Sequence, residues 1–302
     1  MKIHNIKQVT ESFLDNLIPG EEATLSTYQA YRRDMDLFRG FLQKNEKITD
    51  ICKVDASAIY DFKKYLYNEK NYMRSTVDRK MFCLKSFFQY ADVCNYIDEN
   101  PMNKIKYKKQ QRRMITNYLT EEELDIICDT PHKMYIYGYE MRQALIYTLR
   151  YIGARRETII KLNWNDVRFY NSTITLTIGK QVKPEQLTIV MHKRLVETLM
   201  TYYRRARPRY GDPIFISATG NRLSNTGYTK IIQEIVQASG LKKDFAITGH
   251  IFRHSLITIL VQKGYTIADI QRITGQKDPR TLYEYYFKTN DKRMEEAITS
   301  LN

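Results

Sequence analysis

The second half of the sequence contains two arginines, a lysine, a histidine and a tyrosine that could together break a phosphodiester bond: Arg155, Lys180, His250, Arg253 and Tyr285. Guanidinium groups keep their charge in proteins and stabilise the negative charge that grows on phosphate oxygens. A positioned tyrosine hydroxyl is a competent nucleophile, and its phosphate ester keeps the bond energy for rejoining. A lysine or histidine can protonate the departing 5′ oxygen. These residue types therefore predict phosphoryl transfer.

The predicted chemistry needs no metal ion. No group of carboxylates with the spacing of a two-metal site occurs near these residues, and the four cysteines lack the Cys-x-x-Cys spacing of a zinc site. We therefore expect neither a metal nor another cofactor. His250 and Arg253 are three residues apart, so a helix would present both on one face. His254 is expected to pack behind the site.

Four short segments resemble, in their order and separations, the motifs of the tyrosine recombinase (phage integrase) family. They are a Gly-Ala-Arg sequence ending at Arg155, a Gly-Lys turn at Lys180, a His-x-x-Arg-His sequence starting at His250, and a glycine ten positions before Tyr285. Each segment alone is a weak signal, whereas four in order are specific. Asn100-Pro101 and the helical pattern before it resemble the family's linker and core-binding domain, so the resemblance covers nearly the whole chain.

The resemblance implies a role for each of these residues. Arg155 and Arg253 would hold the scissile phosphate, and His250 would hydrogen-bond that phosphate or assist proton transfer. Lys180 would be the general acid for the 5′ oxygen. Tyr285 would form a 3′-phosphotyrosine intermediate, without metal or ATP.

Two positions depart from the family's pattern, and one role has a competitor. Gln276 stands where the family has His or Trp; its amide can donate a hydrogen bond to phosphate but cannot carry a proton. Thr158 stands where the family has an acidic residue, with Glu157 one place earlier. In the turn that contains Lys180, Lys183 is a competing candidate for the general acid.

The elements that position this site are predicted to form two domains of a mainly α protein. Apolar residues recur at helical spacing through the first hundred residues, which predicts a helical, SAM-like core-binding domain over residues 1–102. Residues 118–302 are predicted to form an α+β catalytic domain with a small antiparallel sheet. Its signals are a capping box of Thr120 and Glu123, alternating strands over 173–178 and 186–190, and a short strand over 214–216.

Residues 103–117 are predicted to link the two domains. This segment is basic and can be interpreted as a solvated linker or as a strap along the DNA backbone, and the two interpretations are compatible. The predicted DNA-binding residues are Lys104, Lys106, Lys108, Lys109, Arg112 and Arg113.

Composition agrees with a nucleic-acid partner. The chain carries 48 Lys and Arg against 34 Asp and Glu, a formal net charge of +14, which attracts polyanions. No apolar run is long enough to span a membrane, and the cysteines suit an intracellular protein with reduced thiols. We expect a double-stranded DNA partner with a specific site, no membrane, and a cytoplasmic, nucleoid-associated location.

The sequence therefore predicts a site-specific recombinase of the Xer-like, two-domain form. Two alternatives stay open: a type IB topoisomerase-like enzyme, and an inactive DNA-binding protein with the same fold. Residues 290–302 have the pattern of a short amphipathic helix. Such a tail suits docking into a neighbouring subunit, which favours recombination by a dimer on each site and a tetramer in the synapse.

Overall fold

The computed structural model describes residues 4–17, 25–106, 117–134, 138–179, 185–276, 279–280, 282–283 and 285. The chain divides into two compact units, Met1–Gln111 and Arg112–Asn302. Within the described residues the first unit is helical, and the second adds a small antiparallel sheet to its helices. The predicted fold class is therefore confirmed. The boundary between the units falls within the segment predicted as a linker.

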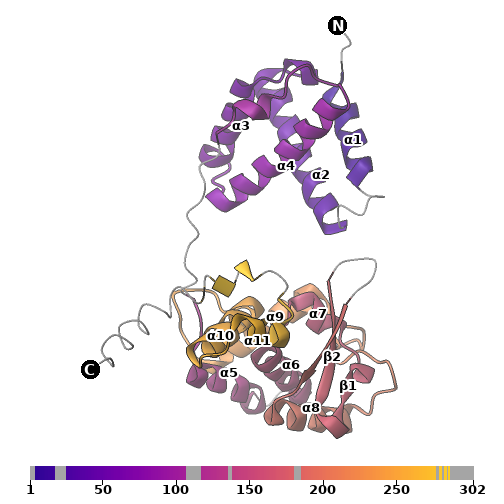
Figure 1. Cartoon of the computed structure of the whole chain (residues 1–302), viewed down its shortest axis with the longest axis vertical. Coiled ribbons are helices and arrows are strands. Elements are labelled where there is room, and N and C mark those ends of the chain that lie inside the picture. The colour runs from indigo at the N-terminus through magenta and orange to yellow at the C-terminus, as the bar shows by residue number, and fades with distance from the viewer. Residues whose placement is uncertain are drawn as a thin grey trace, which may run out of the picture. The chain divides into compact units, whose positions relative to one another are not determined.

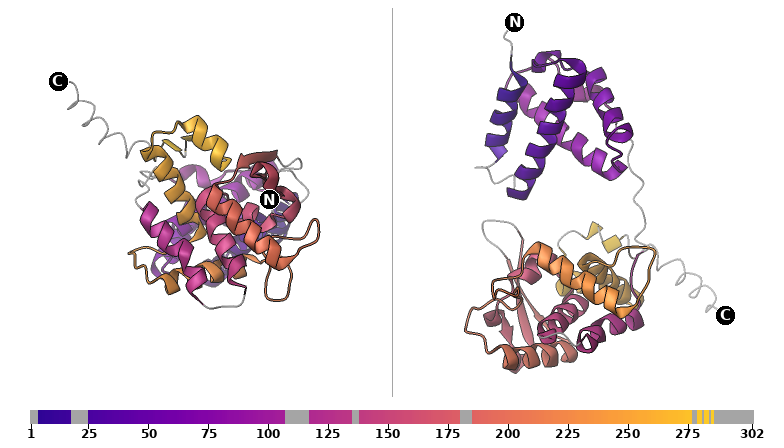
Figure 2. Two further views of the ribbon diagram at one scale, coloured as in Figure 1. Left: turned by 90° about the horizontal axis from the view of Figure 1, so that it is seen from below. Right: turned by 180° about the vertical axis from the view of Figure 1, so that it is seen from behind.

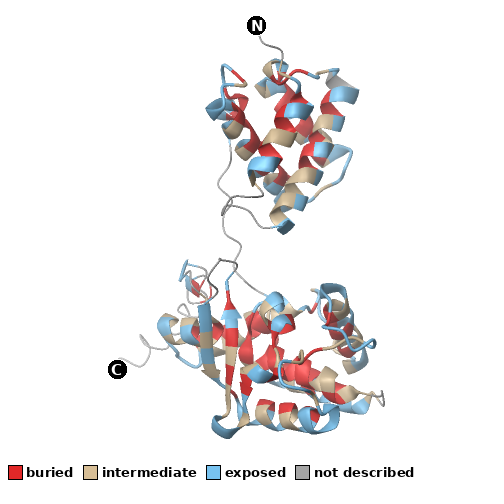
Figure 3. Cartoon of the chain, turned by 90° about the vertical axis from the view of Figure 1, so that its right-hand side faces the viewer, coloured by how far each residue is buried: buried red, intermediate tan, exposed pale blue. Residues whose placement is uncertain are grey.

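The first unit is a group of helices (Figure 1) with buried residues along them (Figure 3). Aromatic side chains make up much of its core. Phe38 and Phe62 meet edge to face with ring centroids 4.9 Å apart, and Phe88 is fully buried beside Phe38. Asp34 is also buried and pairs with two cations, Lys80 at 2.6 Å and Arg79, which compensate the charge of its carboxylate. Its elements are α1 (Ile6–Leu17), α2 (Leu25–Phe41), α3 (Ala56–Asn68) and α4 (Arg74–Val93), a π-helical turn (Leu42–Glu46) and 3₁₀ turns at Ile51–Lys53 and Pro101–Lys104.

The second unit begins where the capping box predicts a helix. The Thr120 hydroxyl accepts from the Glu123 backbone N–H, and the Glu123 carboxylate accepts from the Thr120 N–H at 3.0 Å. The helices are α5 (Glu121–Lys133), α6 (Tyr139–Ile152), α7 (Arg156–Lys161), α8 (Lys193–Ala206), α9 (Asn225–Ser239), α10 (Gly249–Gln262) and α11 (Ile267–Thr274), with 3₁₀ turns at Trp164–Asp166 and Phe169–Asn171. Among the described helices, none is long and apolar enough to cross a membrane.

The sheet lies at one edge of the second unit, as Figure 1 and the rear view in Figure 2 both show. It consists of β1 (Val167–Arg168), β2 (Thr173–Ile178) and β3 (Glu185–Val190), all antiparallel in the order β1-β2-β3. Alternate residues of β2, at 174, 176 and 178, are buried in the core. The predicted pair of strands is confirmed, with β3 starting one residue early, and residues 180–184 lie outside the described ones.

The predicted strand over residues 214–216 is wrong. Ile214 and Phe215 are buried, which explains the strand-like apolar signal. The backbone in this region, however, forms only isolated β-bridges, one between Asn163 and Pro213 and one between Ile216 and Arg222. Burial alone does not make a strand, because a ladder needs a partner along its length.

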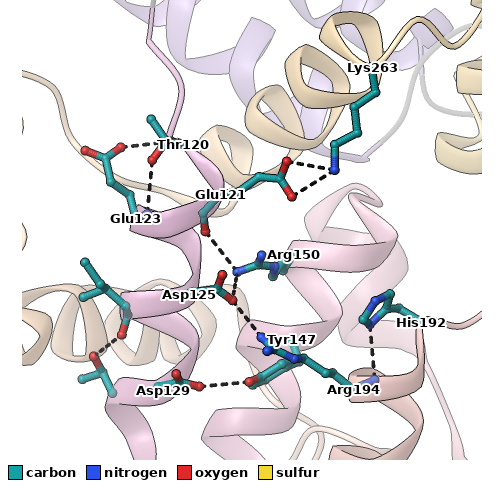
Figure 4. A network of polar contacts seen from close by, with 12 residues as sticks. Thr120, Glu121, Glu123, Asp125, Asp129, Tyr147, Arg150, His192, Arg194 and Lys263 are labelled. Carbon is teal, nitrogen blue, oxygen red and sulfur yellow. Dashed lines mark hydrogen bonds and ion pairs between the residues drawn. The ribbon is translucent and has the colours of Figure 1, made fainter.

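Polar contacts tie α6 to its neighbours (Figure 4). Asp125 on α5 pairs with Arg150 on α6 at 2.7 Å and with Arg194 on α8 at 3.0 Å. One turn further along α5, Asp129 accepts a hydrogen bond from the Tyr147 hydroxyl at 3.0 Å. These contacts hold the second half of α6 against α5 and α8. They therefore fix the position at which the loop after α6 begins.

Candidate active site

The loop between α6 and α7 places the first arginine. Helix α6 ends at Gly153, whose φ of 58° lies in the left-handed region that glycine adopts without strain. A Cβ atom here would lie 2.6 Å from Cδ2 of Leu256 on α10, so that side chain would have to move to make room for it. Arg155 follows as the N-cap of α7, and its side chain is exposed. Glycine thus brings Arg155 beside α10.

Arg253 lies on α10, is 5% exposed, and is held by groups from two other segments. Its Nη1 donates to the carbonyl oxygens of Gly153 at 2.5 Å and Thr274 at 3.1 Å, and its Nη2 donates to Oε1 of Gln276. A guanidinium has five N–H groups. Within the described part of the chain, Nε–H and one Nη2 N–H of Arg253 therefore have no protein acceptor.

The charge of Arg253 is not balanced by a carboxylate of the described residues, and the groups that accept its hydrogen bonds are neutral carbonyl and amide oxygens. Burial, and then the positive charge of Arg155, lowers the pKa of Arg253 to about 10, while Tyr285 acts in the opposite direction. Arg253 still carries its charge near neutral pH. A buried cation without a counter-ion favours binding of an anion.

Two histidines lie one turn apart on α10. The rings of His250 and His254 meet edge to face with centroids 4.2 Å apart. Partial burial, Arg253 and Arg155 lower the pKa of His250. Burial, His250 and Arg253 lower the pKa of His254 to about 4. Both rings are therefore neutral near pH 7, and each keeps one nitrogen that can accept a hydrogen bond.

A cavity of about 750 Å³ brings three of the predicted residues together. Arg155, His250 and Arg253 line it, and so does Gly179 at the end of β2. Other polar residues also line the wall: Arg156, Glu157, Thr158 and Lys161. Three arginines and a neutral histidine around one cavity can bind a phosphate group.

Gln276 lies beside Arg253, although it does not donate to it. A guanidinium can only donate, so the amide oxygen of Gln276 faces Arg253 and its amide nitrogen lies on the other side. The backbone oxygen of Gln276 accepts from Gln271 at 2.9 Å. The preceding Gly275 has a φ of 64°, and a Cβ atom there would lie 2.3 Å from Cδ1 of Ile178. Glycine therefore lets Gln276 approach Arg253.

Tyr285 is 8% exposed and belongs to a cluster with four buried aliphatic side chains from α10, α11 and its own segment. Its hydroxyl oxygen lies 3.0 Å from Nδ1 of His254. Among the described residues, the cavity wall does not include Tyr285. The neighbouring Tyr283 is 49% exposed, so the two tyrosines differ sharply in environment.

Several predicted residues lie outside the described part of the chain. They are Lys180 with its competitor Lys183, the four linker residues Lys108, Lys109, Arg112 and Arg113, and the tail over 290–302. Of the remaining linker residues, Lys104 is exposed and pairs with Glu99 at 2.9 Å, and Lys106 is exposed. The described residues contain no group of His, Cys, Asp or Glu that could hold a metal ion.

Sequence reasoning missed two features of the site. The carbonyl groups of Gly153 and Thr274 hold Arg253, and no side-chain pattern could reveal a backbone partner. The second is the contact of His254 with the Tyr285 hydroxyl, because His254 was expected only to pack behind the site. A signal for it was present: His250 and His254 are four residues apart, which places both on one helix face.

The sequence matches two family descriptions. Residues 117–293 match the Phage integrase family, and residues 10–92 match the phage integrase N-terminal SAM-like domain. The tyrosine recombinase XerD of Listeria monocytogenes serovar 1/2a is 28% identical over 288 residues, covering 93% of this chain and 94% of that protein. The tyrosine recombinase XerC of Pediococcus pentosaceus is 26% identical over 281 residues, covering 89% of each.

Solved structures share the fold. The Tn1549 transposon integrase in complex with transposon right end DNA has a TM-score of 0.76 at 16% identity, covering 98% of this chain and 100% of that chain. The XerH site-specific recombinase bound to a palindromic difH substrate has a TM-score of 0.75 at 20% identity, covering 96% of this chain and 84% of that chain.

Proposed function

This chain belongs to the phage integrase family and is a tyrosine site-specific recombinase, and we propose that it cleaves DNA with Tyr285 while Arg155 and Arg253 hold the scissile phosphate. The hydroxyl oxygen of Tyr285 attacks the phosphorus atom and the bond to the 5′ oxygen breaks. A 3′-phosphotyrosine and a free 5′ hydroxyl result, and the reverse attack by a 5′ hydroxyl rejoins the strand.

One observation carries this proposal: Arg253 is a buried cation on the wall of a cavity that it shares with Arg155 and His250. Two of its N–H groups, Nε–H and one on Nη2, have no acceptor among the described residues and suit two oxygens of one phosphate. The other three N–H groups anchor the guanidinium before any substrate arrives. Preorganised donors of this kind lower the barrier because they need not reorient during the reaction.

His250 and Gln276 complete the proposed phosphate site. His250 lines the cavity as a neutral ring, so its ring N–H can donate to a phosphate oxygen. Gln276 acts first through its oxygen, which fixes the guanidinium of Arg253. Its amide nitrogen is then the end that can donate to phosphate, as His or Trp would in other members of the family.

We propose Lys180 as the general acid that protonates the 5′ oxygen, with Lys183 as its competitor. Gly179, which precedes Lys180, lines the cavity. Lys180→Ala should slow cleavage of a normal phosphodiester much more than cleavage of a 5′-bridging phosphorothiolate, since a thiolate leaves without a proton. Lys183→Ala is the matched control. Equal slowing of both substrates by Lys180→Ala would remove Lys180 from this role.

We also propose how the chain engages DNA. Residues 1–102 would bind the core site, the basic segment 103–117 would follow the phosphate backbone, and residues 118–302 would carry out cleavage. The net charge of +14 supports DNA binding. Solved relatives are complexes with recombination-site or transposon-end DNA. Two copies would bind each specific site and four would form the synapse, in the cytoplasm at the nucleoid.

The alternatives of a type IB topoisomerase-like enzyme and an inactive DNA-binding protein are not favoured. The named relatives are recombinases, and their similarity extends over 89–93% of this chain. Formation of a covalent adduct separates the inactive protein from both kinds of enzyme, because an inactive protein would form no covalent complex.

The test of the nucleophile uses a duplex selected from a randomised pool by its affinity for this chain, so that selection does not depend on cleavage. A nick near the cleavage point makes the fragment with the free 5′ hydroxyl short, so that it dissociates after cleavage. The strand cannot then be rejoined, and the covalent complex is trapped. Tyr285→Phe should bind this duplex normally and form no adduct on a denaturing gel. Tyr283→Phe is the matched control and should form it. An adduct formed by Tyr285→Phe would show that another residue attacks.

A further inference from the structure

The hydroxyl of Tyr285 has a specific partner that the proposed mechanism has not used. Its oxygen lies 3.0 Å from Nδ1 of His254, and the two rings are tilted at 52° with centroids 5.7 Å apart. The rest of the tyrosine ring packs among aliphatic groups, including Ile257 and Val261. Nδ1 of His254 is thus within hydrogen-bond distance of the hydroxyl of Tyr285, whose ring is otherwise in an apolar environment.

The pair has a defined protonation pattern. A phenol keeps its proton below about pH 10 and donates well to an aromatic nitrogen. Burial, His250 and Arg253 lower the pKa of His254 to about 4, so the ring is neutral at physiological pH. With the ring proton on Nε2, Nδ1 has the lone pair that accepts the Tyr285 O–H. His254 is therefore able to receive a proton from Tyr285.

Building on the proposed role of Tyr285, we propose that His254 is a further catalytic residue, the base that takes the proton of the nucleophile. As the hydroxyl oxygen bonds to phosphorus, its O–H bond breaks and the proton moves to Nδ1 of His254. The electron pair of the breaking P–O bond goes to the 5′ oxygen, which takes a proton from the general acid. During rejoining, His254 returns its proton to the phenol oxygen as the tyrosine leaves.

This assignment divides the work of two neighbouring histidines. His250 lines the cavity and is therefore placed to contact the phosphate. His254 contacts the hydroxyl oxygen of Tyr285, which is the reacting atom. The two rings touch edge to face, so each restricts the orientation of the other.

The same geometry couples the strength of the base to the substrate. The groups that act on His254 are His250 and Arg253 on its own helix and Tyr285 opposite, and Arg253 opposes protonation of the ring. A phosphodiester bound to Arg253 brings a negative charge that offsets this cation. His254 therefore becomes a stronger base when DNA occupies the site, which limits activation of Tyr285 to the bound state.

The test combines a substitution at His254 with a tyrosine of lower pKa. In His254→Asn the side-chain oxygen can accept near the position of Nδ1 but cannot hold a proton. Single-turnover cleavage of the selected nicked duplex should fall by about 10²–10⁴, the usual contribution of general-base catalysis, with unchanged duplex affinity. Replacing Tyr285 by a difluorotyrosine, whose hydroxyl ionises without help near neutral pH, should restore most of the lost rate in this variant.

His192→Asn is the matched control. His192 also accepts a hydrogen bond at Nδ1, from the backbone N–H of Arg194, and burial also lowers its pKa. It lies at the start of α8, away from the cavity wall. Its cleavage rate should stay at the wild-type value.

A DNA-free measurement checks the contact itself. The chain has five histidines, so ¹⁵N-histidine labelling gives few ring signals to assign. Tyr285→Phe should shift the Nδ1 signal of His254 and leave that of His192 unchanged. An unshifted His254 signal would overturn the proposal, and so would cleavage by His254→Asn at the wild-type rate. A fall in rate that difluorotyrosine fails to restore would likewise remove the role as base. An adduct formed by Tyr285→Phe would instead overturn the nucleophile assignment.

Discussion

Replacing Gly275 by alanine tests whether the approach of Gln276 to Arg253 depends on packing. Two costs are expected. Alanine in the left-handed region costs about 1–2 kcal/mol, and its Cβ would lie 2.3 Å from Cδ1 of Ile178. Cδ2 of Leu187 would also lie 3.4 Å from this Cβ, and overpacking of a buried site costs about 1–3 kcal/mol. Gly275→Ala should therefore destabilise the second unit by about 2–5 kcal/mol.

Gly240→Ala separates the two costs. Gly240 also ends a helix in the left-handed region, with a φ of 71°, but no atom lies within 4 Å of its missing Cβ. This variant should lose only the backbone part, about 1–2 kcal/mol. Ile178→Val removes the Cδ1 atom itself at a cost of about 0.5–1.5 kcal/mol. Combined with Gly275→Ala it should cost less than the sum, by a coupling of about 1–2 kcal/mol.

Urea unfolding followed by tryptophan fluorescence gives the measurement. Trp164 is the single tryptophan of the chain and is buried in the second unit, so its emission reports on that unit alone. The cleavage rate should also fall in Gly275→Ala, because Thr274 and Gln276 on either side both hold Arg253. Equal destabilisation by Gly275→Ala and Gly240→Ala, or strict additivity with Ile178→Val, would refute the packing argument.

Three further predictions concern chemistry, pH and salt. Gln276→Ala should cleave the nicked duplex about 10²–10³ more slowly without losing affinity, whereas Gln276→His should stay active; an Ala variant as fast as wild type would exclude Gln276 from the site. The folded-state pKa of His254 lies below its usual value of 6.5, so its contribution to stability is complete above about pH 6.5 and is lost as the pH falls toward 4. Urea unfolding should give a lower free energy of unfolding at pH 5 than at pH 7, by up to about 1.4 kcal/mol for each pH unit. This loss should be smaller in His254→Asn. Neutralising the predicted DNA-binding residues at 104–113 should reduce the slope of log K against log salt by about 0.9 for each phosphate that the segment no longer binds; an unchanged slope would favour a solvated linker.

The sequence could predict features that depend on neighbouring residues. The capping box of Thr120 and Glu123 and the alternation of strand β2 are local signals, and both are confirmed. Helix α10 likewise presents His250 and Arg253 to one cavity because they are three residues apart. The strand predicted over 214–216 is wrong because residues 213 and 216 form only isolated bridges. A strand depends on a partner that the segment itself does not encode.

What the sequence could not predict is how Arg253 is held. Its partners Gly153 and Thr274 lie 100 and 21 residues away along the chain, and both contribute backbone oxygens that carry no residue signature. Only the folded packing of α6, α10 and α11 brings them together. The glycines of the motif are a trace of this requirement, because they mark the places where two helices end close to a neighbour.

The anchoring of Arg253 has a consequence for how the site works. The ends of α6 and α11 converge on one guanidinium, and the same guanidinium acts electrostatically on His254, the partner of Tyr285. A phosphate that binds Arg253 would therefore change the electrostatic surroundings of Tyr285 before any bond to phosphorus forms. Charge neutralisation at one arginine can then both hold the substrate and increase the basicity of the residue that contacts the Tyr285 hydroxyl. In the proposed mechanism, substrate binding and activation of Tyr285 are therefore consequences of the same electrostatic event.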